Sequence, residues 1–326
     1  MTLLTNLLHA TSFRSPFLRT LLPSIGLAYA LQAAVAVPSI AAQMERFYDL
    51  SGSLTYLSCT ALSLYLPTIR ARVAASLSAT KPGWPSLLGS LGGNGGSMGW
   101  NWRQVVLSAA VSIWATRLGT YLFGRISADG SDSRFDSIRS HPAKFFGAFM
   151  AQATWVSLCL LPVLALNSIP AATLAALPAL TVTDILGLSL FVGGLGFEVV
   201  ADRQKSEWVA AKKAKRHNED FLTSGLWSKS RHPNYFGEAT LWSGVAVLAG
   251  GVLASGVGQV GMGWKGGVGG RAGAVAMAAV SPAFVTFLLL KVSGVPLSES
   301  KYDKRYGDRK DYQAWKRDTP MFIPKL

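Results

Sequence analysis

The sequence predicts an all-α membrane protein, a polytopic bundle of about seven transmembrane helices. Half of the 326 residues are hydrophobic and only 15% are charged, whereas soluble globular proteins carry roughly 25% charged residues. The mean hydropathy is +0.30. The charged residues gather in short loops between long uncharged stretches, which is the distribution expected of helices embedded in lipid.

Seven stretches are long and apolar enough to cross a bilayer, which takes about 20 residues of α-helix. Within lipid each backbone polar group must be satisfied inside its own segment, and a helix achieves this. The expected spans are 20–41, 50–69, 104–124, 146–166, 183–201, 238–258 and 273–293.

The net charge of +14 would suit a nucleic-acid partner, but its distribution favours a membrane lipid bilayer instead. Eight Lys and Arg residues lie within 203–231 and eight more within 301–326, whereas 167–182 has none. Because basic residues collect on the cytoplasmic side of membrane proteins, we expect these two basic segments in the cytoplasm, together with 125–145. The segment 167–182 is expected on the opposite side. Four basic residues do not fit this topology: Arg70, Arg72, Lys81 and Arg103.

Residues 1–44 contain no acidic residue. They resemble either an organelle transit peptide or a membrane-surface helix that leads into the first span, and the second interpretation is favoured. Only two cysteines occur, both in apolar spans, together with four histidines. This inventory predicts neither a disulfide framework nor a metal site.

Three connections carry distinctive composition. The stretch 82–100 is rich in Gly and Ser and predicts a flexible loop. The stretch 256–270 contains GxGxxG but lacks the preceding strand and the later acidic residue of a dinucleotide fingerprint, so we expect a low-complexity connection there. The 125–145 loop mixes three aspartates with three arginines and is expected to be a solvated connector with internal ion pairs.

Polar residues gather where the 238–258 span begins. Ser230 is a candidate N-cap and Pro233 suits a first helical turn. Arg231, Asn234 and Glu238 follow one another at helical spacing and share a face, while His232 and Tyr235 form a neighbouring stripe. A helix N-terminus and an arginine both favour phosphate.

The preceding span ends in a similar way, with Glu198 and Asp202 four residues apart and Lys205 three further on. These residues could be snorkelling charges at a helix end. Two adjacent spans that bring carboxylates to one cytoplasmic edge favour a binding site instead, because intramembrane ionisable groups usually mark one. The residues suit a nucleotide-like cofactor that carries the chemistry itself.

The stretch "GLWSKSRHPNYFGEATLWSG" (225–244) resembles the core of the steroid 5-alpha-reductase C-terminal domain family, and most closely its DUF1295 branch. Other stretches resemble the same branch: "YDLSGSLTYL" (48–57), "WATRLGTYLFGRI" (114–126), "GSDSRFDSIR" (130–139), "FEVVADRQK" (197–205), "SGVPLSE" (293–299) and "YGDRKDYQAWKRDTPMFIP" (306–324). The resemblance divides the chain into residues 1–44, an N-terminal lead with the first span, and residues 45–326, a steroid-reductase-like membrane domain.

This resemblance implies that cytoplasmic loops and the tail cap a pocket that binds NADPH. A hydride would pass to a carbon–carbon double bond conjugated to a carbonyl in a hydrophobic lipid or sterol-like substrate. Asp202, Asn234 and Glu238 match cofactor-gripping residues of the steroid reductases. The sterol C14-reductases carry a motif that is similar at three positions: Arg231, His232 and Tyr235. Cofactor contacts are further expected from Glu198, Lys205, Tyr302 and Tyr312.

The substrate end departs from the steroid reductases. Trp114 stands where their carbonyl-polarising tyrosine would be, and only Glu45 and Asp49 are early acidic candidates for the partner glutamate. The resemblance therefore leaves His232, Tyr235 and a substitute Tyr121 as candidate catalytic residues, and does not imply a ketosteroid substrate.

Two other functions remain open. Membrane methyltransferases carry a similar "RHPxYxG" stretch and bind S-adenosylmethionine, and a non-catalytic lipid-binding membrane protein could retain the pocket. The endoplasmic reticulum is the expected location, with a mitochondrial membrane as the alternative.

Overall fold

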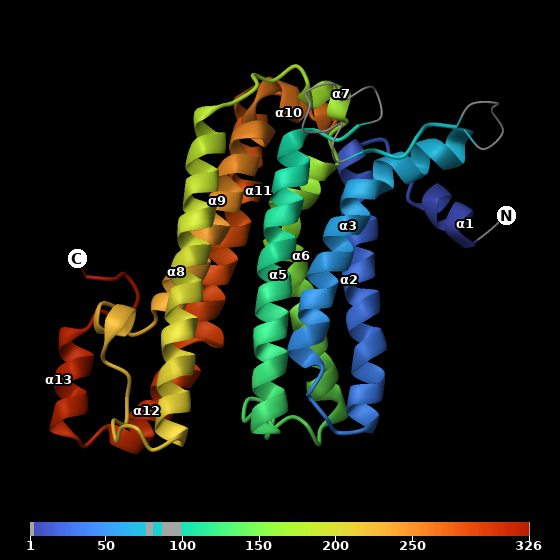
Figure 1. Ribbon diagram of the computed structural model, residues 1–326. Helices are drawn as coiled ribbons and strands as arrows, with labels where there is room; N and C mark the ends of the chain where they lie inside the picture. Colours follow the sequence, from blue (N-terminus) through green and yellow to red (C-terminus); the bar gives the residue numbers. More distant parts are fainter. Residues whose placement is uncertain (1–2, 76–80, 87–98, 326) are drawn as a thin grey trace. The chain divides into compact units, whose positions relative to one another are not determined.

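The computed structural model describes residues 3–75, 81–86 and 99–325, and every regular element within these ranges is a helix (Figure 1). The predicted all-α fold is therefore confirmed. Most of the predicted flexible loop at 82–100 lies outside the described residues.

The chain divides into two compact units. The first unit comprises Met1–Thr181 and Ala249–Val280, and the second comprises Val182–Leu248 and Ser281–Leu326. This division follows packing, so it does not test the predicted boundary after residue 44, which was drawn from sequence similarity.

The first unit is built around four long helices that pack side by side (Figure 1). They are α2 (Pro16–Ala41), α3 (Tyr48–Ala74), α5 (Trp102–Asp129) and α6 (Pro142–Asn167). Three short helices accompany them: α1 (Leu3–Ala10), α7 (Ala171–Leu174) and α10 (Gly256–Gly261).

The second unit contains the long helix α8 (Val182–Lys213) and most of α9 (Pro233–Ala254). The helix α11 (Gly267–Phe287) belongs to the first unit up to Val280. Its last turns belong to the second unit and continue as a π-helical turn, η3 (Leu288–Val292), before the tail helices. The remaining elements are the 3₁₀ turn η2 (Gly225–Ser228), α12 (Val295–Tyr306) and α13 (Lys310–Asp318).

Six of the described helices are long and apolar enough to cross a membrane, and the protein is an integral multi-pass membrane protein. They correspond to six of the seven predicted spans. The other predicted span, 50–69, is helical as α3, but hydroxyl-bearing residues lower its hydropathy. Ser51, Thr55 and Ser63 are buried, and Thr55 accepts a hydrogen bond from Gln32 of α2 at 2.8 Å. The polar residues of α3 therefore face other helices.

Glycines allow α8 and α9 to pack backbone against backbone. A Cβ atom on Gly194 would lie 2.5 Å from the Leu241 backbone nitrogen, and one on Gly244 would lie 2.5 Å from the Gly187 oxygen. Small residues at such contacts allow transmembrane helices to approach closely. The buried residues Glu198 and Asp202 follow these glycines along the same face of α8.

The structure corrects two expectations about loops. The glycine-rich stretch 256–270 is largely helical: Gly258 and Gly261 are buried in α10, and α11 begins at Gly267. The 125–145 loop does contain internal ion pairs, such as Arg134 with Asp132 at 2.8 Å. It is not simply a solvated connector, because Phe135 is buried against α6.

Two of the basic residues that did not fit the expected topology are used within the first unit. Arg103 is buried and donates to the Pro178 carbonyl at 2.8 Å. Arg70 donates to the Leu8 carbonyl at 2.7 Å and to the Thr11 hydroxyl at 2.6 Å. Because these guanidinium groups bind other parts of the protein, their charge carries little information about the side of the membrane.

Candidate functional site: an aromatic and cationic cavity

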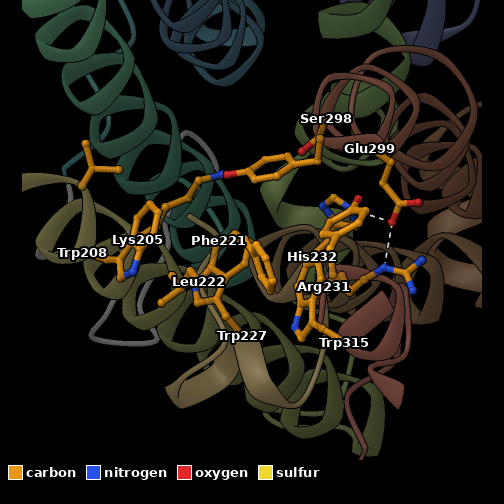
Figure 2. Close-up of a pocket in the computed structure, with 13 residues that line it drawn as sticks. Lys205, Trp208, Phe221, Leu222, Trp227, Arg231, His232, Ser298, Glu299 and Trp315 are labelled. Atoms are coloured by element: carbon orange, nitrogen blue, oxygen red, sulfur yellow. Dashed lines mark hydrogen bonds and ion pairs between the residues drawn. The ribbon is translucent and has the colours of Figure 1, made fainter. Parts of the chain in front are cut away.

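The second unit contains a cavity of about 540 Å³ of empty space, counted with the part that opens to solvent. Figure 2 shows Lys205 and Trp208 on one side of it and Arg231 and Glu299 on the other. The lining combines aromatic rings with cationic side chains. Its members are Lys205, Trp208, Val209, Phe221, Leu222, Trp227, Arg231, His232, Ser298, Glu299, Tyr302, Tyr312 and Trp315.

Four segments supply this lining. The last turns of α8 provide Lys205 and Trp208, and the segment before α9 provides the residues from 221 to 232. The break in the helix after η3 lets α12 carry Glu299 to the cavity, and α13 adds Trp315. Irregular turns of this kind within long helices occur frequently at functional sites.

Arg231 joins the start of α9 to the tail. Its Nε donates to Glu299 at 2.8 Å, and its Nη1 donates to the carbonyls of Thr319, at 3.0 Å, and Lys316. Its backbone N–H donates to the Pro320 carbonyl at 2.9 Å. The predicted phosphate donor therefore lies in the cavity wall and also holds the tail in place.

His232 lies beside Glu299 and under Tyr235. Its Nε2 is 3.3 Å from Glu299 Oε1, and its ring stacks on that of Tyr235 with centroids 5.2 Å apart. Burial lowers the pKa of His232, and the nearby Lys205 and Arg231 act in the same direction, while Glu299 acts against them. Burial and the neighbouring cations therefore favour the neutral imidazole.

Ser230 is not the N-cap predicted for α9. The helix begins at Pro233, as expected, so the preceding position belongs to His232. The Ser230 hydroxyl accepts the His232 backbone N–H at 3.1 Å and donates to the Phe322 carbonyl at 2.9 Å. Its role is to fasten the tail to this loop.

The aromatic wall is built around Phe221, Tyr306 and Tyr312, with Tyr302 and Trp315 packed against them. Lys205 Nζ lies 4.8 Å from the centre of the Trp227 ring, a favourable cation–π distance. Among the described residues, none accepts a hydrogen bond from the buried Trp315 indole N–H. Such donors are normally satisfied, and this one belongs to a residue that lines the cavity.

A second polar group lies where α8 and α9 meet. The Asn234 side-chain amide donates to Asp202 Oδ1 at 3.2 Å, and Glu198, one turn earlier, is also buried. No described residue donates to the buried Asn234 Oδ1. The two adjacent spans thus bring polar residues together, within one turn of Lys205 and His232 in the cavity wall.

The predicted cofactor residues fall into two groups. Five line the cavity: Lys205, Arg231, His232, Tyr302 and Tyr312. The other five do not line it. Of these, Glu198, Asp202 and Asn234 lie at the α8–α9 contact, Tyr235 stacks on His232, and Glu238 is half-buried in the second turn of α9. The candidate catalytic residue Tyr121 is on α5 of the first unit, so it is not placed relative to this cavity.

Several lining residues were missed by sequence reasoning. Glu299 ends the stretch "SGVPLSE", which indicated only the family, and one carboxylate ahead of a tail that mixes basic residues with four aspartates gave no further signal. Trp208 and Phe221 follow no motif, and Trp315 lies in the stretch 306–324, which indicated the family but no role for this residue. Their convergence depends on how the tail folds back, which residue spacing does not reveal.

The early candidates Trp114 and Glu45 also have structural surroundings in the first unit. Trp114 is fully buried and packs edge-on against Tyr56, with ring centroids 5.1 Å apart. Glu45 accepts two hydrogen bonds from Arg139, at 2.6 and 2.7 Å, and one from the Asp132 backbone N–H at 2.8 Å. Glu45 therefore fastens the 125–145 loop.

Comparison with known protein families gives one match. Residues 84–260 and 267–319, well over half of the chain, match the family described as "Protein of unknown function (DUF1295)". No curated protein and no solved structure is significantly similar to the chain.

Proposed function

The chain belongs to the DUF1295 family, and we propose that it is a membrane reductase that uses NADPH to reduce a carbon–carbon double bond conjugated to a carbonyl. The substrate would be a hydrophobic lipid or sterol-like molecule. The observation that carries this proposal is the cavity of the second unit, in which cationic side chains and aromatic rings surround one space.

The lining fits the chemistry of a dinucleotide. Cofactor sites are concave and lined mostly by apolar and aromatic side chains, with a few polar groups that fix the orientation of the ligand, and this cavity has that kind of lining. The rings of Trp208, Phe221 and Trp315 offer stacking surfaces for a base. Lys205 and Arg231 offer positive charge for phosphates.

Two unsatisfied polar atoms support the same assignment. The Trp315 indole N–H and the Asn234 Oδ1 atom have no hydrogen-bond partner among the described residues. An acceptor on a dinucleotide in the cavity could satisfy the Trp315 N–H, whereas Asn234, which lies at the α8–α9 contact outside the lining, would be reached only by a ligand that extends past the cavity. Since an unpaired buried polar atom is costly, a bound nucleotide would stabilise this part of the protein.

NADPH, when bound, would supply the hydride. The protein would supply the proton that the reduced substrate needs, and His232 and Tyr235 are the candidates. The Tyr235 hydroxyl would give the proton directly, because ring stacking is not a hydrogen bond and relays none, while the 3.3 Å contact of His232 with Glu299 fixes the imidazole against the phenol ring. We assign Tyr235 as the donor and His232 as the group that orients it.

The charge of the wall favours this function over S-adenosylmethionine-dependent methyl transfer. NADPH carries several phosphate groups and S-adenosylmethionine carries none, while Lys205, Arg231 and Lys316 make this region basic. Thermal unfolding of the purified protein in detergent distinguishes the two. A ligand at a hundredfold excess over its Kd stabilises the folded state by about 2.7 kcal/mol.

We expect stabilisation by NADPH and none by S-adenosylmethionine. Asn234→Ala should lose the shift, and Thr240→Ala should keep it. Thr240 is the matched control because it lies on the same helix and its hydroxyl binds only the Phe236 carbonyl of that helix. Stabilisation by S-adenosylmethionine alone would favour a methyltransferase, and stabilisation by neither would favour a non-catalytic lipid-binding protein.

The membrane of residence is part of the proposal. We place the protein in the endoplasmic reticulum, where a lipid substrate is accessible from a cytoplasmic cofactor site. Fractionation of cells that express the tagged chain tests this, and co-purification with mitochondrial membranes would overturn it.

A further inference from the structure

Glu299 lies at the point where three positive or hydrogen-bond-donating groups converge. Its Oε1 is 2.8 Å from Arg231 Nε and 3.3 Å from His232 Nε2, and its Oε2 is 3.4 Å from Lys316 Nζ. We call these four residues the cavity cluster. Glu299, Arg231 and His232 also line the cavity, so the carboxylate holds the position that an external anion would otherwise fill.

The members of the cavity cluster come from three different segments. Arg231 and His232 precede α9, Glu299 is on α12 and Lys316 is on α13. Figure 2 shows the Glu299 carboxylate turned toward Arg231. A carboxylate and a phosphate present the same acceptor oxygens to a guanidinium group, so the two would compete for one place.

We propose that Glu299 is an internal counter-ion that occupies the anion position of the ligand-free cavity, and that a phosphate group of the ligand displaces it. This inference rests on the proposed function only in that it assigns the phosphate to a nucleotide. Glu299 thereby sets how tightly the site holds its ligand.

The partners of Glu299 can stay in place when the carboxylate leaves. Arg231 remains bound to the carbonyls of Lys316 and Thr319. Lys316 keeps a second carboxylate, Asp303, at 2.6 Å. The positive groups are thus held by contacts that do not depend on Glu299, as an anion site requires.

The variant Glu299→Gln tests the inference because it removes the charge and keeps the size of the side chain. Inorganic pyrophosphate is the probe, and isothermal titration calorimetry of the full chain in detergent is the measurement. We expect pyrophosphate to bind Glu299→Gln on the order of tenfold more tightly than the wild type.

Asp303→Asn is the matched control. Asp303 is on the same helix and also contacts Lys316, but it is exposed and outside the lining of the cavity; the Asn side chain keeps an acceptor for the Tyr312 hydroxyl, which donates to Asp303 at 2.8 Å. Its replacement should raise the affinity for pyrophosphate by much less. Equal increases in the two variants, or weaker binding to Glu299→Gln, would mean that Glu299 is only a structural partner of Arg231.

A second variant keeps the inference testable if Glu299→Gln does not fold. Lys316→Met removes a cation from the cavity cluster, and we expect it to weaken pyrophosphate binding severalfold. Unchanged binding to a folded Lys316→Met protein would overturn the inference.

Competition separates this inference from the proposed function. If NADPH displaces pyrophosphate, both stand. If pyrophosphate binds Glu299→Gln more tightly but NADPH does not compete, the inference stands and the reductase proposal falls. Displacement by a short-chain phosphatidic acid instead would assign the phosphate to a lipid headgroup. NADPH binding that is equal in wild type and Glu299→Gln would overturn the inference alone.

Discussion

Two clusters of charged residues in this protein contain similar side chains but have different surroundings. In the first unit, Glu45, Asp49, Asp132, Arg134 and Arg139 form what we call the ion-pair cap. The ring of Phe135 fills the space beneath it, with Tyr48 and Phe149 around it. In the second unit, the cavity cluster borders an open space. Charge alone therefore does not indicate a ligand site, and we propose one only where charged groups border an open space.

The two clusters also differ in what their charges bind. In the ion-pair cap, Glu45 accepts hydrogen bonds from Nε and Nη2 of Arg139 and from a backbone N–H, so both of its oxygens are bound within the protein. In the cavity wall, the Trp315 N–H lacks a partner among the described residues. The ion-pair cap is complete as it stands, whereas the cavity offers a polar group to a ligand.

The largest effect is expected from a substitution that disrupts the packing of α8 against α9 in the second unit. Gly194→Val would place side-chain atoms against the backbone of α9, because even a Cβ there lies 2.5 Å from the Leu241 nitrogen. We expect a loss of more than about 4 kcal/mol in the free energy of unfolding, seen as loss of monodisperse protein in detergent. The neighbour Gly193 has no atom within 4 Å of its Cβ position, so Gly193→Val should fold.

The next largest effect is expected from a substitution that breaks the ion-pair cap. Glu45→Ala would leave Arg139 and the Asp132 N–H without their acceptor, and we expect a loss of about 2 kcal/mol in the free energy of unfolding. Unfolding in a denaturing detergent titration measures it. Asp136→Ala should cost less than about 0.5 kcal/mol, because Asp136 meets Arg139 only at an exposed site. Neither variant should alter the affinity for NADPH. A changed affinity would mean that the ion-pair cap and the cavity cluster do not have separate roles.

A smaller effect concerns the unpaired indole. Trp315→Phe should leave the free energy of unfolding nearly unchanged, because the N–H has no acceptor to lose among the described residues. It should weaken NADPH binding about threefold to tenfold, the worth of one hydrogen bond. Trp227→Phe should lower the free energy of unfolding and leave NADPH binding nearly unchanged, since the Trp227 N–H donates to the Ala201 carbonyl at 3.0 Å. Equal behaviour of the two variants in both assays would count against a ligand at Trp315.

The smallest expected effect is a pH dependence of stability. Burial lowers the pKa of His232 below its ordinary 6.5, so the unfolded chain takes up a proton more readily than the folded protein. The free energy of unfolding should therefore decrease as the pH falls from 7 through 6.5, and level off below the folded-state pKa. His232→Gln should flatten this slope in thermal unfolding scans across the range. An identical slope in both proteins would show that another group is responsible.

The sequence predicted the elements well because spans are defined by length and apolar composition. The predicted span 146–166 became α6 (Pro142–Asn167), and 183–201 became the first part of α8. The continuation of α8 to Lys213 was missed, because its last twelve residues are too polar to be part of a bilayer span. The expected meeting of polar residues from the two adjacent spans is seen where Asn234 of α9 donates a hydrogen bond to Asp202 of α8.

The wall of the cavity could not be predicted in the same way. Trp208 and Trp315 are more than a hundred residues apart, and only the folded tail brings both to one space. Arg231 was expected to be a free phosphate donor, yet its carbonyl contacts with the tail follow from no local pattern. The variant Arg231→Ala should therefore lower the free energy of unfolding as well as weaken ligand binding. The spacing of residues predicts which side chains share a face of one helix. It does not predict which helix faces the C-terminal tail packs against.

Calorimetric titration of NADPH into the full chain tests the central claim most directly. Lys205→Met removes a cation of the cavity wall, and Lys213→Met removes one at the end of the same helix, outside the lining. We predict saturable binding of one NADPH to the wild type and to Lys213→Met, and binding at least tenfold weaker to Lys205→Met. Absence of saturable binding to the wild type, or equal affinity in the two variants, would contradict the account.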